Sequence, residues 1–380
     1  MDPKKFGFGL MRLPLKDESD FESIDMEQLE QMVDLFMENG YNYFDTAYPY
    51  HMGKSEEAIR ETLVKRYPRE KFLLADKMPL FFVEKEEDLE KFFTEQLERC
   101  GVDYFDYYLL HNVSNWTKKA YTKVDSFKYL RQLKEEGKIK HLGMSYHDNA
   151  KLLEKIIKEH PEIEFVQLQI NYLDWENDSI QAKECYEVCQ KYNLPIVVME
   201  PLKGGTLINM PTDAKNRFLK DYPDNSMVSW SFRFIEGLDN ILTTLCGVSN
   251  LEQMEENIEV MNNISPLNSE ELTVVGEVVD IINSEIAIPC TACNYCVEMC
   301  PESIPIPTYF KLYNDLEQMG FEQFSAQQIY YRTYALKEDV GMASDCIKCG
   351  DCIRKCPQHL NVPSYLEDVY EKLEKTMNDG

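Results

Sequence analysis

A chain of 380 residues that is 44% hydrophobic, with 16 glycines and 17 prolines, has the composition of a folded protein of about two to three domains. Its 40 basic and 67 acidic residues give a formal charge of −27, which disfavours binding to nucleic acid or to an anionic membrane surface. The chain has no apolar run of about 18 residues and no signal-peptide core at its start, so we expect a soluble, cytoplasmic protein that does not enter a membrane.

Short β-rich apolar runs alternate with stretches of helical periodicity from residue 1 to about residue 284. The runs are Lys5 to Arg12, Tyr41 to Ala47, Phe72 to Lys77, Tyr104 to His111, His141 to Tyr146, Phe165 to Tyr172, Leu194 to Pro201 and Ile241 to Val248. The helical stretches are Met26 to Asn39, Ser55 to Arg66, Glu84 to Cys100, Tyr121 to Glu136, Ala150 to Glu159, Ser179 to Tyr192, Ser226 to Ile235 and Leu251 to Met261.

Eight strand-then-helix units predict an α/β protein built on a (β/α)8 TIM barrel over residues 1–284. An open, doubly wound sheet is the alternative, but no Gly-x-Gly-x-x-Gly follows the first strand. After a ninth helical stretch, Ser269 to Ser284, the chain becomes rich in cysteine and proline. We therefore expect a small, mostly helical second domain over residues 285–380, with helical character from Thr308 to Leu336 and a C-terminal helix from Ser364 to Met377.

Eight of the 12 cysteines lie in two runs of the form Cys-x2-Cys-x2-Cys-x3-Cys-Pro. This spacing wraps three thiolates around one iron–sulfur cube, and the fourth cysteine of each run ligates the other cluster. The first predicted [4Fe–4S] cluster therefore has the ligands Cys290, Cys293, Cys296 and Cys356, and the second has Cys346, Cys349, Cys352 and Cys300. Two zinc sites are the alternative, although zinc sites favour paired rather than tripled cysteines. The two runs resemble bacterial two-cluster ferredoxins, and the long helical segment between them is more like the α-helical ferredoxin type.

Polar side chains end three successive predicted strands of the barrel, where the active sites of such barrels lie. They are Asp45 with the following Tyr50, Lys77 and His111. A nearby Lys77 ammonium would stabilise a Tyr50 phenolate, and Asp45 would hold and balance the lysine, so this group could exchange a proton with a bound molecule. The alternative is a structural ion pair with a loop tyrosine and a core histidine.

At these residues the chain resembles the aldo-keto reductases, whose Asp, Tyr, Lys and His tetrad it matches in order and context. Further matches extend over the barrel: Gly7 to Arg12, Gly53 to Glu56, Gly137 to Ile139, Gly143 to Ser145, Gln169 with Tyr172, Pro201 to Gly205, and Gly247 to Asn257. The resemblance implies an oxidoreductase that transfers a hydride between NAD(H) or NADP(H) and a small carbonyl or alcohol. Reducing a carbonyl requires a proton for an oxygen that is becoming an alkoxide, and we expect Tyr50 to deliver it and His111 to orient the substrate.

The resemblance also implies the cofactor contacts. Ser145 and Gln169 would hold the carboxamide, Pro201, Leu202, Gly204 and Gly205 would shape the pyrophosphate loop, and Gly247, Ser249, Gln253 and Asn257 would meet the adenosine, with Met11, Arg12 and Asp45 also at the cofactor. The chain departs from the family at Ser145-Tyr146, where the family has Ser-Asn, and at Met199-Glu200, where it has an aromatic residue and serine. Residues 247–257 contain no lysine or arginine for a 2′-phosphate, so NAD and NADP both stay open.

A nicotinamide exchanges two electrons and a cubane one, and the usual converter between them, a flavin, has no signature in this chain. The clusters are therefore structural or sensing, or they transfer electrons, with a ferredoxin or flavoprotein as a possible partner. An alternative function is a ferredoxin-linked electron carrier or redox sensor whose barrel has lost nicotinamide chemistry. A third is a cluster-driven reductase whose barrel only holds substrate. His51 and His147 are further candidates for substrate contact at the barrel rim.

Overall fold

The computed structural model describes the chain except for residues 18–19, 115–116, 178–179, 320–330, 332–338 and 376–380. Its contacts form two compact units, each made of two stretches of chain. The first unit comprises residues 1–201 and 228–267, and the second comprises residues 202–227 and 268–380. No helix within the described ranges is long and apolar enough to cross a membrane.

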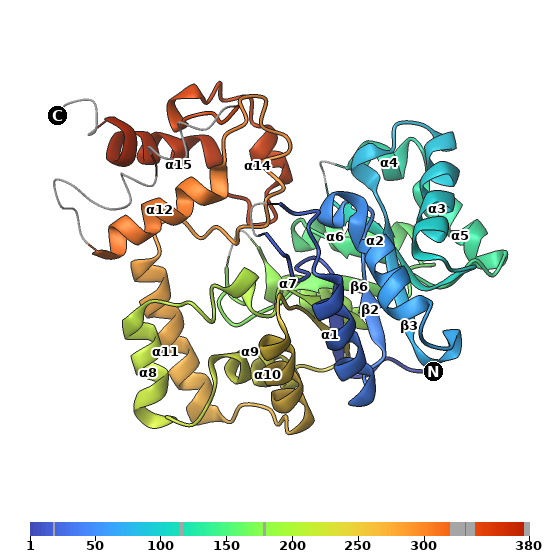
Figure 1. The fold of residues 1–380 in the computed structure, drawn as a ribbon, viewed down its shortest axis with the longest axis horizontal. Helices are drawn as coiled ribbons and strands as arrows, with labels where there is room; N and C mark the ends of the chain where they lie inside the picture. Colours follow the sequence, from blue (N-terminus) through green and yellow to red (C-terminus); the bar gives the residue numbers. More distant parts are fainter. Residues whose placement is uncertain (18–19, 115–116, 178–179, 320–330, 332–338, 376–380) are drawn as a thin grey trace. The chain divides into compact units, whose positions relative to one another are not determined.

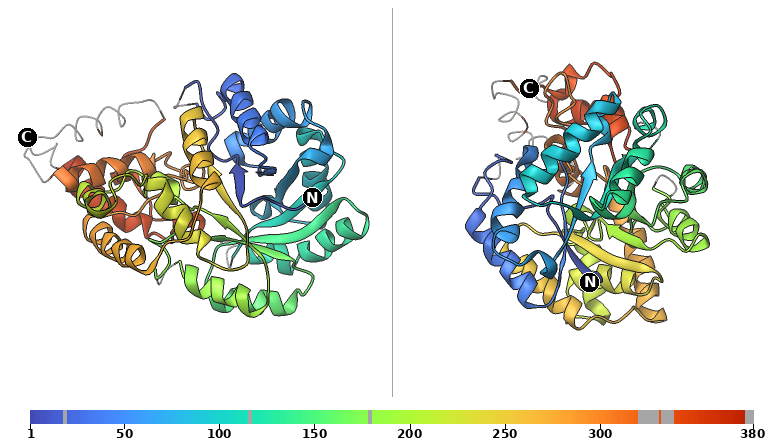
Figure 2. Two further views of the ribbon diagram at one scale, coloured as in Figure 1. Left: turned by 90° about the horizontal axis from the view of Figure 1, so that it is seen from below. Right: turned by 90° about the vertical axis from the view of Figure 1, so that its right-hand side faces the viewer.

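Eight parallel strands close into a barrel in the first unit, each pairing with the next along the chain and the last with the first (Figure 1 and Figure 2). This confirms the predicted (β/α)8 fold. The strands are β1 (Phe6–Gly9), β2 (Tyr43–Asp45), β3 (Leu73–Met78), β4 (Phe105–Val113), β5 (Ile139–Tyr146), β6 (Phe165–Gln169), β7 (Ile196–Met199) and β8 (Ile241–Gly247).

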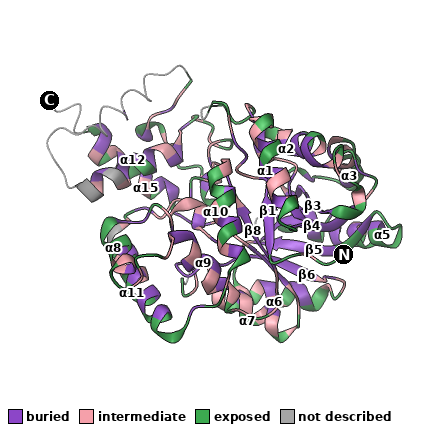
Figure 3. Cartoon of the chain, turned by 60° about the horizontal axis from the view of Figure 1, so that its bottom comes forward, coloured by how far each residue is buried: buried purple, intermediate pink, exposed green. Residues whose placement is uncertain are grey.

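The strands are almost wholly buried, as Figure 3 shows, so their apolar runs are continuous rather than alternating. One cluster of buried strand side chains consists of Tyr43, Leu73, Ala75, Tyr107, Leu109, Phe165, Val197 and Leu245. Gly143 of β5 makes room for one of these, because a Cβ built there would lie 2.4 Å from the ring of Phe165. The absence of a side chain at Gly143 is therefore a packing requirement of the barrel.

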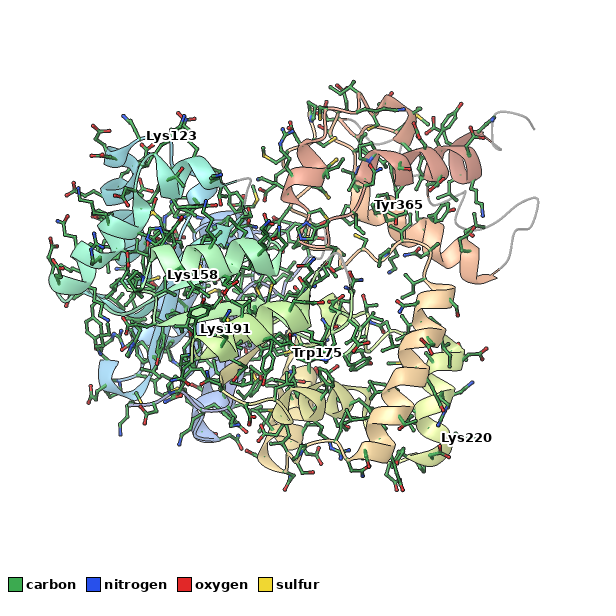
Figure 4. The ribbon with its side chains drawn as sticks, turned by 180° about the vertical axis from the view of Figure 1, so that it is seen from behind. Lys123, Lys158, Trp175, Lys191, Lys220 and Tyr365 are labelled. Carbon is green, nitrogen blue, oxygen red and sulfur yellow. The ribbon has the colours of Figure 1, made fainter. Side chains whose placement is uncertain are left out.

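Amphipathic helices surround the strands of this unit. They are α1 (Met26–Glu38), α2 (Lys54–Ile59), α3 (Glu86–Cys100), α4 (Lys118–Thr122), α5 (Ser126–Glu135), α6 (Ala150–Glu159), α7 (Ala182–Lys191), α9 (Met227–Glu236) and α10 (Leu251–Asn262). In α6, Leu153, Ile156 and Ile157 are buried on one face, and the side chain of Asn149 caps the N-terminus by accepting from the Leu152 N–H. Lys158, on the opposite face of α6, and Lys191, the last residue of α7, are exposed (Figure 4).

The second unit is mostly helical and has its own core. Its helices are α8 (Thr212–Asp221), α11 (Ser269–Glu285), α12 (Ile306–Met319), α14 (Asp351–Lys355) and α15 (Val362–Val369). Tyr309 and Phe310 of α12 pack with Val362 and Leu366 of α15 in a buried cluster that several cysteines of the two runs adjoin. Of the predicted helical segment from Thr308 to Leu336, residues 320–330 and 332–336 lie outside the described residues, as do residues 376–377 of the predicted C-terminal helix.

Candidate active site and cluster sites

A buried ion pair lies at the carboxyl ends of β2 and β3. The Lys77 ammonium donates to Asp45 Oδ1 at 2.6 Å and to the Thr46 carbonyl at 2.7 Å, and the Lys77 and Asp45 side chains are only 1% and 4% exposed. The same ammonium lies 3.4 Å from the Tyr50 hydroxyl and 4.9 Å from the centre of its ring. The single positive charge of Lys77 is thus in contact with the oxygens of two side chains, Asp45 and Tyr50.

Burial raises the pKa of Asp45, and the Lys77 ammonium acts against that rise. An ammonium whose charge is partly balanced by a carboxylate still favours a negative charge on a neighbouring oxygen. The oxygen placed to use it is that of Tyr50. The arrangement can therefore support proton transfer to and from the tyrosine hydroxyl.

His111, in β4, lies beside this group. Its ring meets that of Tyr50 edge to face, with centroids 6.0 Å apart. Burial lowers the pKa of His111 well below its usual range, and the charge of Lys77 acts in the same direction. Within the described chain its Nδ1 has no hydrogen-bond partner. A neutral imidazole with a nitrogen still to be satisfied is suited to an uncharged substrate oxygen.

The two other histidines considered for substrate contact have different surroundings. His51 Nε2 accepts from the Leu13 N–H at 3.0 Å, and His51 Nδ1 lies 2.9 Å from the Phe21 carbonyl. Both ring nitrogens of His51 therefore contact the backbone of the segment that follows β1, and the residue joins that segment to the turn that begins at Tyr50. His147 Nε2 is 2.8 Å from the Ser145 hydroxyl, and His147 is one of the groups that lower the pKa of His111, so it lies near the tetrad.

The predicted carboxamide contacts lie at the ends of β5 and β6. Ser145 is bonded to His147, and Gln169 Nε2 donates to Asp174 Oδ2 at 2.8 Å. Where the resemblance implies serine, the chain has Glu200, whose Oε2 is buried without a hydrogen-bond partner among the described residues. A buried carboxylate oxygen requires a donor, which an amide or a ribose hydroxyl can supply.

The predicted adenosine contacts adjoin the end of β1. The Ser249 hydroxyl donates to the Arg12 carbonyl at 3.2 Å, and a Cβ on Gly247 would lie 3.2 Å from that of Arg12. The Ser249 N–H donates to Gln253 Oε1 at 2.8 Å, and Asn257 is buried in α10. The structure thus brings Met11 and Arg12 beside residues 247–257, which contain no lysine or arginine.

The eight cysteines of the two runs line two small hollows in the second unit. Cluster site A is lined by Cys290, Cys293, Cys296 and Cys356, and cluster site B by Cys300, Cys346, Cys349 and Cys352. Each hollow brings together three cysteines of one run and the last cysteine of the other. Ile306 lines both hollows, so the two sites are neighbours.

The backbone around the two sites is repeated. Ala292 and Asn294 in the first run and Lys348 and Gly350 in the second adopt positive φ at equivalent places between the cysteines. Ser303 and His359, each three residues after the last cysteine of its run, do the same. Left-handed backbone at a residue other than glycine costs about 1–3 kcal/mol, and such residues cluster where a ligand is clamped.

The spacing of the sulfur atoms bears on which metal group fits. Around one zinc ion, four thiolates at about 2.3 Å would lie about 3.8 Å from one another. Across the described residues, the one group of three or more ligand atoms within 4.8 Å of each other is Glu56, Asp76 and Cys100, in the first unit. The sulfurs of sites A and B are therefore spread more widely than a single zinc ion requires, and an all-thiolate donor set fits an iron–sulfur cube.

Comparison with known proteins is consistent with both halves of this description. Residues 5–280 match the model of the Aldo/keto reductase family, and residues 289–361 match that of a 4Fe-4S dicluster domain. The chain belongs to the aldo/keto reductase family. It is an oxidoreductase with an iron–sulfur domain at its C-terminal end.

Individual relatives of this aldo/keto reductase are distant. An uncharacterized oxidoreductase of Bacillus subtilis is 24% identical over 61% of this chain and 81% of its own length. The NADH-specific methylglyoxal reductase of Escherichia coli is 26% identical over 44% of this chain and 54% of its own length. A solved aldo/keto reductase from Klebsiella pneumoniae, in complex with NADP and acetate, has the same fold, with a TM-score of 0.57, 18% identity, and coverage of 73% of this chain and 92% of that one.

The sequence analysis did not predict the buried polar residues that pack next to Lys77 in this aldo/keto reductase. Asp76 Oδ1 accepts from the Lys77 N–H and from Gln96 Nε2, each at 2.7 Å. Burial and the neighbouring Glu56 carboxyl raise the pKa of Asp76 well above its usual range. Glu56 also pairs with Arg99 at 3.1 Å. These buried groups hold the backbone of Lys77 in place. The sign of them in the sequence was an aspartate directly before the lysine.

The pyrophosphate loop implied by the resemblance begins at Pro201, the last residue of this stretch in the first unit. Leu202, Gly204 and Gly205 belong to the second unit. Gly204 and Gly205 have φ values of 63° and 96°, where glycine is favoured. Between Leu202 and Gly204, Lys203 also has a positive φ, 47°, and its side chain is buried.

Proposed function

We propose that this protein reduces a small carbonyl compound, or oxidises the corresponding alcohol, with NAD(H) or NADP(H), and that Tyr50 is the proton donor in reduction. The observation that carries the proposal is the single buried ammonium of Lys77, shared by Asp45 and the Tyr50 hydroxyl. A structural ion pair would not require a tyrosine hydroxyl beside it. Reduced nicotinamide, when bound, supplies the hydride to the carbonyl carbon.

The chain's own residues supply the other half of the reaction. As negative charge grows on the substrate oxygen, the proton of Tyr50 moves to it, and the Lys77 ammonium stabilises the phenolate left behind. His111, which is neutral near pH 7, donates a hydrogen bond that orients the same oxygen. Asp45 keeps Lys77 in place, so its role is that of a positioning residue.

Support for the nicotinamide comes from polar groups at the strand ends of the first unit. Ser145, Gln169 and Glu200 present a hydroxyl, an amide and a half-buried carboxylate there. The Glu200 carboxylate replaces an uncharged residue of the family pattern and favours contact with donors such as an amide or ribose hydroxyls. It disfavours contact with a phosphate, which would face a like charge.

Support for two [4Fe–4S] clusters comes from the cysteine spacing and from the two hollows. We assign site A to one cluster and site B to the other, with the cysteines that line each hollow as ligands. The clusters supply folding free energy to a small helical unit and one electron each. An external ferredoxin or flavoprotein is the proposed source of electrons if the clusters turn over.

The test is Tyr50→Phe in anaerobically purified full-length protein. We expect loss of carbonyl reduction by a factor of 10³ or more with unchanged nicotinamide affinity, measured by fluorescence titration with NADH and with NADPH. Phenylalanine keeps the ring that packs on Lys77 and His111, so we expect the substitution to change the stability of the protein little. Retention of near-wild-type rates with a good substrate would refute the role of Tyr50, and failure to bind either nicotinamide would favour the cluster-driven alternative.

A further inference from the structure

The two runs differ in charge at several equivalent positions, and one of these pairs lines the two hollows. Two residues after the last cysteine of each run, site B has Glu302 and site A has Gln358, and each lines its hollow. The repeated backbone makes these positions comparable, because each is followed by a residue of positive φ, Ser303 or His359. The repeat therefore places a carboxylate at one site and an uncharged amide at the other.

A lysine from outside the two cysteine runs lies beside site A. Lys203 Nζ donates to Gln358 Oε1 at 2.6 Å, and the Lys203 side chain is buried. Lys203 lies in the turn between β7 and α8, 155 residues away from its partner. Both residues belong to the second unit. The ammonium thus adjoins the wall of site A, and burial limits the screening of its charge by salt.

Lys203 lies beside a wall residue of site A. Its partner Gln358 lines the same hollow as the ligand Cys356 and follows that cysteine by two residues in the chain. Hydrogen bonds to the sulfurs and local charge are the means by which a protein sets the potential of an iron–sulfur cluster. A cube gains one negative charge when it takes up one electron, so a nearby cation favours the reduced state.

We propose that Lys203 raises the reduction potential of the cluster at site A and that Glu302 lowers the potential of the cluster at site B. Lys203 supplies a positive charge beside site A and does not ligate the cluster. The inference rests on the proposed presence of two clusters and is independent of the role of Tyr50.

The test is an anaerobic redox titration of the full-length protein with dithionite, followed by electron paramagnetic resonance. In Lys203→Met we expect one of the two midpoint potentials to fall, with a shift of about tenfold in the one-electron equilibrium, which is about 59 mV. In Glu302→Gln the other potential should rise. Lys203→Arg should stay near wild type, and Lys220→Met, an exposed lysine of α8 labelled in Figure 4, is the matched control.

The outcomes separate the possible failures. Clearly fewer than about eight iron atoms per chain in the wild-type protein would refute the presence of two clusters. With both clusters present, unchanged potentials in Lys203→Met, or movement of the same potential by Lys203→Met and Glu302→Gln, would overturn the role of Lys203. If Lys203→Met loses iron, Gln358→Glu keeps the contact as an ion pair and adds a negative charge at site A. It must lower the potential that Glu302→Gln leaves unchanged, and otherwise the proposal fails.

Discussion

In a variant without Lys77, the buried Asp45 carboxyl has no cationic partner, and the resulting loss of unfolding free energy depends on pH. In Lys77→Met the Asp45 side chain, 4% exposed in the wild type, loses the donor at 2.6 Å, and the Thr46 carbonyl loses its own at 2.7 Å. An unpaired buried charge costs about 3–5 kcal/mol, unless the carboxyl takes up a proton instead. The lost hydrogen bond at Thr46 adds about 1 kcal/mol at any pH.

Burial raises the pKa of Asp45 and the Lys77 ammonium acts against that rise, so removing Lys77 raises this pKa further above its unfolded value of about 3.9. A group with a raised folded pKa contributes stability below the unfolded pKa and loses it as pH rises toward the folded pKa. Each unit above the unfolded pKa costs about 1.4 kcal/mol, so at pH 5 the carboxyl term is about 1.5 kcal/mol. We therefore expect Lys77→Met to lose about 2–3 kcal/mol at pH 5 and about 4–6 kcal/mol at pH 8.

The assay is anaerobic urea unfolding followed by tryptophan fluorescence, since Trp230 is fully buried in the first unit. Lys158→Met, an exposed lysine of α6 paired with Glu154, is the control and should leave the unfolding free energy nearly unchanged. The double variant with Asp45→Asn should recover most of the loss, because no unpaired charge stays buried. A loss in Lys77→Met that is below 1 kcal/mol, or equal at pH 5 and pH 8, would refute the reasoning.

Three further outcomes follow from the structure. His51→Ala leaves the Leu13 N–H and the Phe21 carbonyl without their partner and should lower the unfolding free energy by about 1–3 kcal/mol; a change below 0.5 kcal/mol in urea unfolding would contradict this. Gly143→Ala forces a Cβ against the Phe165 ring and should cost about 1–3 kcal/mol, and an unchanged melting temperature would show that the barrel yields there. Removing iron with a chelator should reduce helical circular dichroism and leave tryptophan fluorescence native; a native far-ultraviolet spectrum without iron would exclude a structural role for the clusters.

The fold could be predicted because each barrel strand is a continuous apolar run that ends at a turn signal. Among the helices that the sequence analysis missed, α8 has only Ala214 and Phe218 buried among its 10 residues, so its periodicity is too weak to be noticed. Its packing against α11, where Arg217 Nε pairs with Glu277, comes from tertiary contact and not from a local pattern. The predicted boundary near residue 285 stays a prediction.

The candidate site was predictable to the extent that the topology determines it. Parallel strands in a closed barrel bring their carboxyl ends to one mouth, so Asp45, Lys77 and His111 had to be neighbours once the strands were recognised. What each side chain bonds to was not predictable. The contact of Lys203 with Gln358 joins residues far apart in the chain, and nothing in the spacing of either segment indicates it.

The most direct test of the proposed chemistry follows the hydride. Wild-type protein and Tyr50→Phe would be incubated anaerobically with a panel of small carbonyls and nicotinamide that carries deuterium at the transferable position, and the alcohol product analysed by mass spectrometry. We expect one deuterium on the carbinol carbon with wild type, no product with Tyr50→Phe, and no bleaching of cluster absorption. Alcohol formed without deuterium, or only when dithionite reduces the clusters, would contradict hydride transfer at the tetrad.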